Sequence, residues 1–220
     1  AACGARLTVT DTKTKEELAA SLAALAPYPG ISYVLGEHRM EDFTACDMVI
    51  KAAGVPLDSP YVAAARKAGV PVHMSTALFA RFAREAGATL VGVTGTRGKS
   101  TVTHLIHHAL VAAGKSARLG GNIRGVSTLA MLPDIAAGDI VVLELDSWQL
   151  QGFGELRVSP QVAVFTNFLN DHFNYYQHDS QAYFWDKANI FLYQKHGDRL
   201  FVGAQALPRV EKALPPTPPL

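Results

Sequence analysis

The chain has 220 residues, of which 49% are hydrophobic, and its 20 basic and 19 acidic side chains leave a formal net charge of +1. That length is enough for one large or two small α/β domains. The balanced charge gives no case for nucleic acid or an anionic membrane as the main partner, and the two cysteines do not make a disulfide framework.

No signal peptide and no apolar run of membrane-spanning length is present, so we expect a cytoplasmic protein. The first residue is Ala1 and not Met, which leaves room for a lost export signal.

The first 86 residues alternate between predicted strands and helices. Apolar spacing at three and four positions indicates a first helix, which Pro27 and Gly30 end. Ser59 is expected to cap the second helix. This alternation predicts a parallel sheet with right-handed crossovers, and Gly87 is the expected hinge to a second domain. We expect strands over residues 6–10, 31–35, 47–51 and 70–73, and helices over 13–25, 60–68 and 75–86.

The second part of the chain repeats this alternation. The run DIVVLEL is its clearest buried strand, which we expect to be central in the second sheet. The expected fold class is therefore α/β, with two Rossmann-like units and mainly parallel sheets. The proline-rich tail after Leu214 cannot hold regular structure. Strands are expected over residues 90–94, 116–119, 139–145, 161–166 and 199–202, and helices over 99–113 and 179–193.

The stretch from Leu90 to Ala109 reads as strand, glycine turn and helix, which is the geometry of a phosphate-binding loop. Gly95 and Gly98 let the backbone approach phosphate oxygens. The N–H groups at the helix start, together with the helix dipole, favour an anion there. Lys99 can reach the outer phosphates, and the Ser100 hydroxyl can bind Mg²⁺.

The loop is shorter than the general pattern G-x-x-x-x-G-K-[ST], whose first glycine would fall at Val93. What stands here is T-G-T-x-G-K-S-T over residues 94–101. The alternative is an ordinary βα turn in which Gly-Lys-Ser occurs by chance. The strand before the loop and the helix after it favour the phosphate-binding interpretation.

Polar groups at later strand ends could also take part in chemistry. Glu144 lies at the carboxyl end of DIVVLEL, an end that lines the ligand crevice in an open α/β sheet. Asn167, Asp171 and His172 follow the next strand, and Lys187 lies on a helix with aromatic neighbours. The plainer interpretations are a buried ion pair for Glu144, a satisfied histidine for His172 and a solvated lysine for Lys187.

Three histidines, His104, His107 and His108, lie on the helix after the phosphate loop. Their spacing of three and four could suggest a metal site. No carboxylate accompanies them, so we expect them at exposed and boundary positions instead.

In this arrangement the chain resembles the Mur ligase family, the ATP-dependent amide ligases that build the peptidoglycan stem peptide. Within that family it is most similar to the D-glutamate-adding branch. The match spans nearly the whole chain. The matching pieces are, in order, Thr94–Thr101, Gly121-Asn122-Ile123, Leu143-Glu144-Leu145 with Ser147-Trp148-Gln149-Leu150, Thr166-Asn167, Asp171-His172 and Asp186-Lys187-Ala188-Asn189.

The resemblance implies ATP and Mg²⁺ as cofactors. It places one Mg²⁺ on Ser100 and Glu144 and a second on His172, and it matches Lys187 to a lysine that the family carries as a carbamate. A carbamate is an anionic oxygen ligand, whereas an ammonium has no lone pair for Mg²⁺. The residues so assigned are the nucleotide-binding Gly95, Thr96, Arg97, Gly98, Lys99, Ser100, Thr101 and Asn167, the metal-binding Ser100, Glu144, His172 and carbamylated Lys187, and the catalytic Lys99, His172 and Lys187.

The implied reaction joins D-glutamate to UDP-N-acetylmuramoyl-L-alanine through an acyl phosphate. Asn122 would face the muramoyl substrate, and Asp11 and Thr12 match a strand-end pair that contacts the uridine nucleotide sugar. Residues 1–87 would be the UDP-sugar-binding domain without its first strand and loop, and 88–220 most of the central ATP-binding ligase domain. The family's third domain is absent, and we expect a monomer with neither nucleic acid nor membrane insertion.

Two residues depart from the branch's usual pattern. Asp146 stands where serine is usual, and Arg124 interrupts Gly-Asn-Ile-Gly, so contacts to the substrate carboxylate or the phosphates could change. The alternatives are another Mur ligase, a folylpolyglutamate synthase-like ligase, or a non-catalytic nucleotide-binding fragment. The first two share the phosphate loop, and the missing third domain favours the last.

Overall fold

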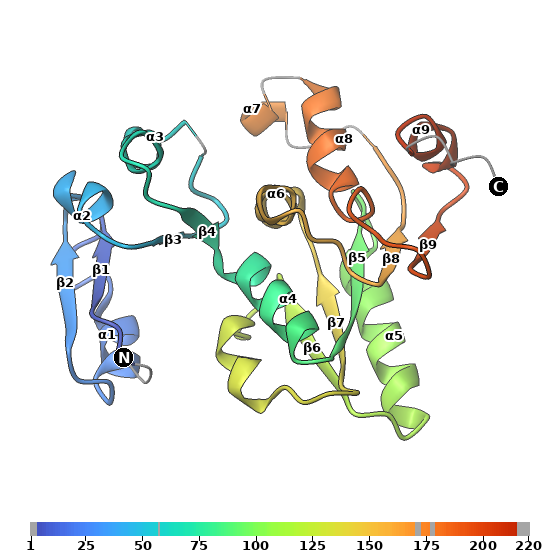
Figure 1. The fold of residues 1–220 in the computed structure, drawn as a ribbon, viewed down its shortest axis with the longest axis horizontal. Coiled ribbons are helices and arrows are strands. Elements are labelled where there is room, and N and C mark those ends of the chain that lie inside the picture. The colour runs from blue at the N-terminus through green and yellow to red at the C-terminus, as the bar shows by residue number, and fades with distance from the viewer. Residues whose placement is uncertain (1–3, 57, 170–172, 177–178, 215–220) are drawn as a thin grey trace. The chain divides into compact units, whose positions relative to one another are not determined.

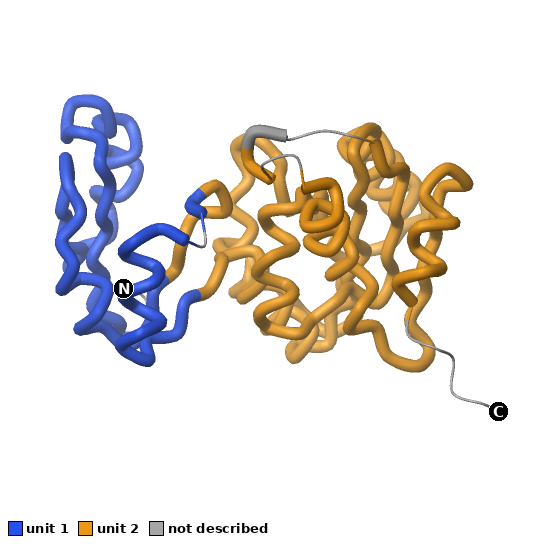
Figure 2. The backbone as a smooth tube through the Cα atoms, turned by 90° about the horizontal axis from the view of Figure 1, so that it is seen from above, with its two compact units in different colours: residues 1–49, 55–72 blue, residues 50–54, 73–220 orange. Residues whose placement is uncertain are grey.

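The computed structural model describes residues 4–56, 58–169, 173–176 and 179–214. The chain forms two compact α/β units, drawn in separate colours in Figure 2. The first unit holds residues 1–49 and 55–72, and the second holds 50–54 and 73–220. The chain passes between them within two short strands, β3 (Val49–Lys51) and β4 (Val72–Met74).

The first unit is built on two parallel strands, β1 (Leu7–Asp11) and β2 (Ile31–Leu35), paired with Leu7 opposite Ile31. Its helices are α1 (Ala19–Leu25), α2 (Glu41–Thr44) and α3 (Pro60–Lys67). A small core of valines and alanines lies under α3, and its buried members are Val62, Ala65, Val70 and Val72.

Two local details of this unit differ from the sequence predictions. The first helix begins at Ala19 and not at residue 13, and a turn over residues 15–18 precedes it. In that turn the Glu17 side chain accepts from the Thr14 N–H at 2.8 Å and the Thr14 hydroxyl accepts from the Glu17 N–H at 3.4 Å, the reciprocal pattern of a capping box. Ser59 occupies the N-cap position of α3, as predicted, but its side chain makes no capping hydrogen bond. Pro60 at the first helical position supplies the start signal instead.

The second unit contains a five-stranded sheet in the order β6-β7-β5-β8-β9. Every neighbouring pair in it is parallel, which confirms the predicted fold class. We expected DIVVLEL to be the central strand, and this was wrong: β7 lies between β6 and β5, and β5 is the middle strand. The strands are β5 (Thr89–Thr94), β6 (Ala117–Gly121), β7 (Ile140–Glu144), β8 (Val162–Phe165) and β9 (Arg199–Val202).

Helices cover both faces of this sheet. The crossover through α5 (Lys99–Ala112) runs from β5 towards β6, and the one through α6 (Ser147–Leu156) runs from β7 the other way to β8. Right-handed crossovers in opposite directions place their helices on opposite faces, as Figure 1 shows. Leu90 and Leu143 accordingly face the large core under α4 (Ser75–Glu85) and α6.

Helix α4 belongs to the second unit by its packing. Its buried side chains include Phe79 and Ala83, which are part of the large core. It also lies so close to α6 that a Cβ atom on Gly152 would come within 3.1 Å of the Cβ of Ala77. The compact units therefore divide before α4, earlier in the chain than the hinge we expected at Gly87.

Several short elements carried no clear sequence signal. Gly152 and Gly154 interrupt the apolar periodicity of α6, which we did not predict. The helix expected over 179–193 is shorter than predicted, since α8 covers only Ser180–Ala188. The other elements are η1 (Leu129–Asp134), α7 (Phe173–Tyr176), α8 (Ser180–Ala188) and α9 (Leu207–Glu211).

Within the described part of the chain, no helix has both the length and the apolar character needed to cross a membrane.

The end of α6 holds an unusual backbone conformation. Arg157 has φ 49° and ψ 49°, and among the described residues it is the one non-glycine residue with positive φ. Two backbone bonds close the helix around it, from Arg157 N to Gly154 O at 3.1 Å and from Val158 N to Phe153 O at 3.0 Å. Glycine is the usual residue at such a left-handed helix end, because a Cβ atom is strained there.

Glycine should therefore be more stable than alanine at this position. We expect Arg157→Gly to be more stable than Arg157→Ala by about 0.5–1 kcal/mol, because both remove the side chain but glycine alone removes the left-handed strain. Urea unfolding of the two variants measures the difference. Equal unfolding midpoints, or a less stable glycine variant, would contradict the strain at this position.

Candidate functional site

The predicted phosphate loop has the predicted geometry. Strand β5 ends at Thr94 and α5 begins at Lys99, with Gly98 as N-cap residue at φ 80°. Gly95 has φ 143°, and a Cβ atom there would lie 2.0 Å from the Thr166 hydroxyl oxygen. Both glycines are thus required, Gly98 by its backbone angle and Gly95 by its angle and its surroundings.

The end of the neighbouring strand β8 holds the loop in place. The Thr96 N–H donates to the Asn167 carbonyl at 2.9 Å, and the Arg97 N–H donates to the Asn167 side-chain oxygen at 2.9 Å. In return the Arg97 carbonyl accepts from Asn167 Nδ2 at 3.1 Å and from the Thr166 hydroxyl at 2.7 Å. Asn167 was predicted to contact nucleotide, and its side chain here positions the loop backbone.

A buried hydroxyl closes the loop from inside. Thr96 is 4% exposed, and its Oγ1 accepts from the Leu169 N–H at 2.9 Å and donates to the Leu169 carbonyl at 3.1 Å. The Tyr183 hydroxyl on α8 lies 3.4 Å from the same Oγ1. Tyr183 was not singled out from the sequence, because an aromatic residue on a helix gives no signal beyond packing.

The positive and hydroxyl groups of the loop lie at the start of α5. Lys99 folds back over the loop, and its Nζ donates to the carbonyls of Gly95 at 3.2 Å and Thr96 at 3.3 Å. Ser100 and Thr101, in the first turn of the helix, are exposed. The groups expected to meet phosphate and Mg²⁺ are therefore on one short segment that is open to solvent.

Glu144 ends β7 directly beside this loop. It is opposite Val93 of β5 and Gly121 of β6 in the sheet register. The residue is only 5% exposed, yet within the described ranges its carboxylate forms no hydrogen bond and no ion pair. The ion pair that we weighed as an alternative is not formed among these residues. A buried carboxylate is costly without a partner, and a bound cation would remove that cost.

Lys187 reaches the loop from α8. It is 1% exposed, so the alternative of a solvated lysine is wrong. Its Nζ donates to the Gly95 carbonyl at 3.0 Å and lies 4.8 Å from the centroid of the Tyr183 ring. Lys99 and Lys187 thus contact the same loop carbonyl from two different helices.

A buried polar cluster beside Lys187 fixes α8 against α6. The Asp186 carboxylate accepts from Gln151 Nε2 at 2.8 Å and from the Tyr176 hydroxyl at 2.9 Å. Burial raises the pKa of the Asp186 carboxyl, while these two bonds and the nearby Lys187 charge oppose that rise. Burial and the adjacent Asp186 also raise the pKa of the Tyr176 hydroxyl.

The two departures from the expected pattern lie near these strand ends. Asp146 is the N-cap of α6 and accepts from the Gln149 N–H at 2.7 Å, while the Gln149 side chain accepts from the Asp146 N–H at 3.3 Å. Aspartate and serine are comparable N-caps, so this substitution keeps the helix start. Asn122 and Arg124 are both exposed, and the Asn122 N–H donates to the Glu144 carbonyl at 2.8 Å.

Other predicted residues lie apart from this loop or outside the described ranges. Asp11 is the last residue of β1 in the first unit and Thr12 follows it, and Asp11 Oδ1 accepts from the Lys13 N–H at 2.9 Å. Asp171 and His172 fall outside the described residues. The residues that the structure does describe contain no group of three or more His, Cys, Asp or Glu side chains that could hold a metal ion.

The three histidines of α5 occupy the exposed and intermediate positions that we predicted. His104 Nδ1 lies 2.8 Å from the Ser100 carbonyl, and His107 Nε2 lies 3.2 Å from the Ala117 carbonyl. These contacts attach the side chains to nearby backbone.

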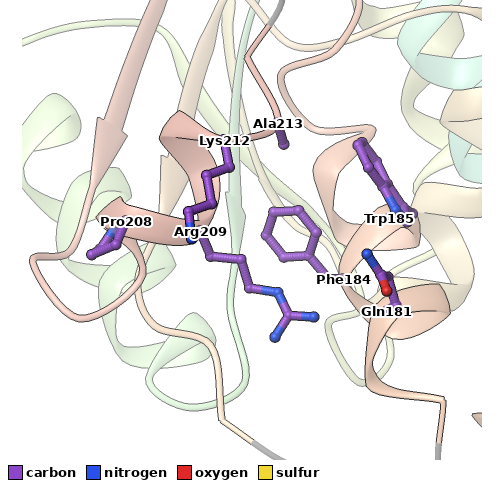
Figure 3. A pocket seen from close by; sticks show the side chains of 7 residues that line it. All are labelled: Gln181, Phe184, Trp185, Pro208, Arg209, Lys212 and Ala213. Atoms are coloured by element: carbon purple, nitrogen blue, oxygen red, sulfur yellow. The ribbon is translucent and has the colours of Figure 1, made fainter.

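A cavity of about 430 Å³ lies between α8 and α9. Figure 3 shows Arg209 extending across it beside Phe184. The Arg209 guanidinium carbon is 4.5 Å from the centroid of the Phe168 ring and 5.0 Å from that of Phe184, and Nη2 donates to the Ser180 carbonyl at 3.3 Å. Its charge is thus engaged in fastening α9 to α8.

Comparison with known proteins gives a family and a fold. A ligase named UDP-N-acetylmuramoylalanine–D-glutamate ligase from Roseiflexus sp. (strain RS-1) is 39% identical over 92% of this chain and 42% of its own length. One of the same name from Borreliella burgdorferi (strain ZS7) is 38% identical over 88% of this chain and 41% of its own length. The chain therefore spans about two fifths of the length of these curated relatives.

A solved structure agrees with the fold. The UDP-N-acetylmuramate:L-alanyl-gamma-D-glutamyl-meso-diaminopimelate ligase from Neisseria meningitides is 18% identical, with a TM-score of 0.63 over 96% of this chain and 68% of that one. The model of the Mur ligase middle domain matches residues 93–213, which is more than half of the chain. These residues carry the phosphate loop, Glu144 and Lys187, and the chain belongs to the Mur ligase family.

Proposed function

We propose that this chain is part of an ATP-dependent amide ligase that joins D-glutamate to UDP-N-acetylmuramoyl-L-alanine in peptidoglycan precursor synthesis. The name shared by the two curated relatives supports the choice of D-glutamate. Residues Asp11, Thr12 and Asn122 are the proposed contacts to the UDP-muramoyl substrate. A monomer in the cytoplasm belongs to the same proposal.

The observation that carries the proposal is the meeting of four elements at one loop. Strand β5 and helix α5 form the loop, Asn167 holds it from β8, and Lys187 reaches it from α8. Backbone N–H groups at a helix start form a site for a phosphate group. Lys99 at present contacts two carbonyls of the loop, and these contacts could be exchanged for the outer phosphate oxygens of ATP.

The residues present also fit Mg²⁺. The Glu144 carboxylate is buried without a partner among the described residues, and the Ser100 hydroxyl is exposed beside the loop. Oxygen donors of these two kinds are preferred by Mg²⁺. Ser100 and Glu144 would hold the ion, with His172 proposed for a second. Bound there, the ion would neutralise charge on the phosphates.

The chemistry has two steps. A carboxylate oxygen of the substrate attacks the γ-phosphorus of ATP, ADP leaves, and an acyl phosphate forms. The amine of D-glutamate then attacks the acyl carbon, and inorganic phosphate leaves as the amide bond forms. Lys99 and the loop N–H groups would stabilise the charge that develops on the transferred phosphoryl group.

Lys187 would act as a carbamate in this scheme. In the structure its Nζ contacts a carbonyl and the face of an aromatic ring, both of which suit an ammonium group. The ammonium would first lose a proton, and the neutral amine would attack the carbon of carbon dioxide. Loss of a second proton would leave an anionic carbamate whose nitrogen keeps one N–H. The new oxygens would then be available as metal ligands beside Glu144.

Removal of the Lys99 charge should weaken nucleotide binding. We expect Lys99→Ala to lower the affinity of the 220-residue chain for Mg²⁺–ATP by about tenfold or more, because a charge-assisted phosphate contact is lost. Calorimetric titration measures this. Lys115→Ala removes an exposed lysine after the same helix and should leave the affinity unchanged; equal affinities for all three proteins would refute the phosphate-loop assignment.

The carbamate can be tested without an activity assay. After incubation with ¹³C-bicarbonate, the chain should show a carbamate carbon signal by NMR that is absent in Lys187→Met. Methionine keeps the length and volume of the buried side chain, which limits the effect on packing. The signal should persist in Lys99→Met. A signal that survives in Lys187→Met, or its absence from the unaltered chain, would be inconsistent with the proposed carbamate.

A further inference from the structure

A second charged cavity lies in the second unit, away from the phosphate loop. Its volume is about 400 Å³, within the range of small-molecule sites. The ends of α4 and α6 and the turn before β9 form its walls. The polar side chains at its surface include Arg81, Arg84, Glu85, Arg157, Tyr193 and Lys195.

This cavity is at the opposite end of the sheet from the nucleotide site. Gln161, which also lines it, directly precedes β8. Its side-chain oxygen accepts from the Leu90 N–H at 3.0 Å, and its Nε2 donates to the Ala88 carbonyl at 3.2 Å. Both contacts are at the start of β5, whereas the phosphate loop follows the end of that strand.

The lining is strongly cationic, with four basic side chains and one carboxylate. Two of the four are engaged. Arg81 Nε pairs with Glu85 at 3.1 Å, and Arg84 Nη1 donates to the Ser159 carbonyl. The other two are Arg157 and Lys195, whose charged groups form no hydrogen bond or ion pair with any residue of the described ranges. In the cavity beside α9, by contrast, Arg209 is engaged with two aromatic rings.

The backbone at Arg157 gives an independent reason to look for a ligand. The residue is held in the left-handed region, where glycine is favoured, and its side chain makes no hydrogen bond or ion pair to a described residue that would offset that strain. Strained backbone of this kind is concentrated at functional sites. A guanidinium group that lines a cationic cavity is a suitable anchor for an oxyanion, because its fork of donors matches phosphate oxygens.

We propose that this cavity is a binding site for a small polyvalent phosphate-bearing anion, distinct from the phosphate loop. Arg157 and Lys195 supply the free charges, Arg84 adds a partly buried third, and Tyr193 also lines the cavity. The excess of positive charge favours a ligand with several negative charges over a single carboxylate. The site does not depend on the ligase activity proposed above.

The probe is inorganic tripolyphosphate, titrated calorimetrically without Mg²⁺ into the 220-residue chain carrying Lys99→Ala, which weakens the phosphate-loop site. We expect saturable binding of one equivalent. Arg157→Gly and Lys195→Ala should each reduce the affinity about tenfold or more, because each removes a charge-assisted contact. Lys115→Ala removes an exposed charge outside the cavity and should leave the affinity unchanged.

A thermal melt of each variant checks folding. If Arg157→Gly is unfolded, Lys195→Ala decides the matter, since the Lys195 side chain forms no hydrogen bond or ion pair with a described residue. The proposal is overturned if no saturable binding occurs, or if neither cavity variant changes the affinity. It is overturned equally if Lys115→Ala weakens binding as much as they do, because that result indicates diffuse attraction to a basic surface.

Discussion

The structure of the second unit depends on how a four-residue turn is held between β5 and α5. The loop backbone has no regular partner of its own, so Thr166 and Asn167 at the end of β8 supply its hydrogen bonds. This contact requires the absence of a side chain at Gly95, where a Cβ atom would overlap the Thr166 hydroxyl. A rigid loop keeps its free N–H groups directed at one point, which is the condition for binding phosphate with little loss of entropy.

The topology of the sheet places that loop where a ligand can reach it. The crossover after β5 runs to one side and the crossover after β7 runs to the other, so the chain reverses direction next to the middle strand. Crevices in open α/β sheets form at such a reversal, outside the carboxyl ends of the strands. Glu144 ends β7 at this point, and Asn122 follows the end of β6. The expected ligands of one site therefore come from strands that are distant in the sequence.

The sequence predicted the parts of this arrangement that depend on local pattern. The strands, the glycine turn and α5 were found because apolar runs, glycines and helix periodicity are local signals. Helix α6 was missed because Gly152 and Gly154 obscure its period, and Gly152 is present for its contact with α4, which is a tertiary cause. Because α4 packs in the core of the second unit, the boundary between the units lies before α4 and not at Gly87. Lys187 shows the same limit, since only family resemblance suggested that a lysine in that helix would be buried.

The burial of Lys187 follows from the polar cluster one residue before it. A partly buried carboxylate at Asp186 is tolerated because Gln151 and Tyr176 donate to it. These bonds join α8 to α6 and to α7, and they set the rotation of α8 about its axis. Because successive residues on a helix point about 100° apart, fixing Asp186 towards α6 turns Lys187 towards Gly95. Asp146 also contributes to this orientation. Its bond from the Gln149 N–H holds the first turn of α6, the helix that carries Gln151. The orientation of the proposed carbamate lysine therefore depends on hydrogen bonds among α6, α7 and α8, away from the loop backbone that Lys187 contacts.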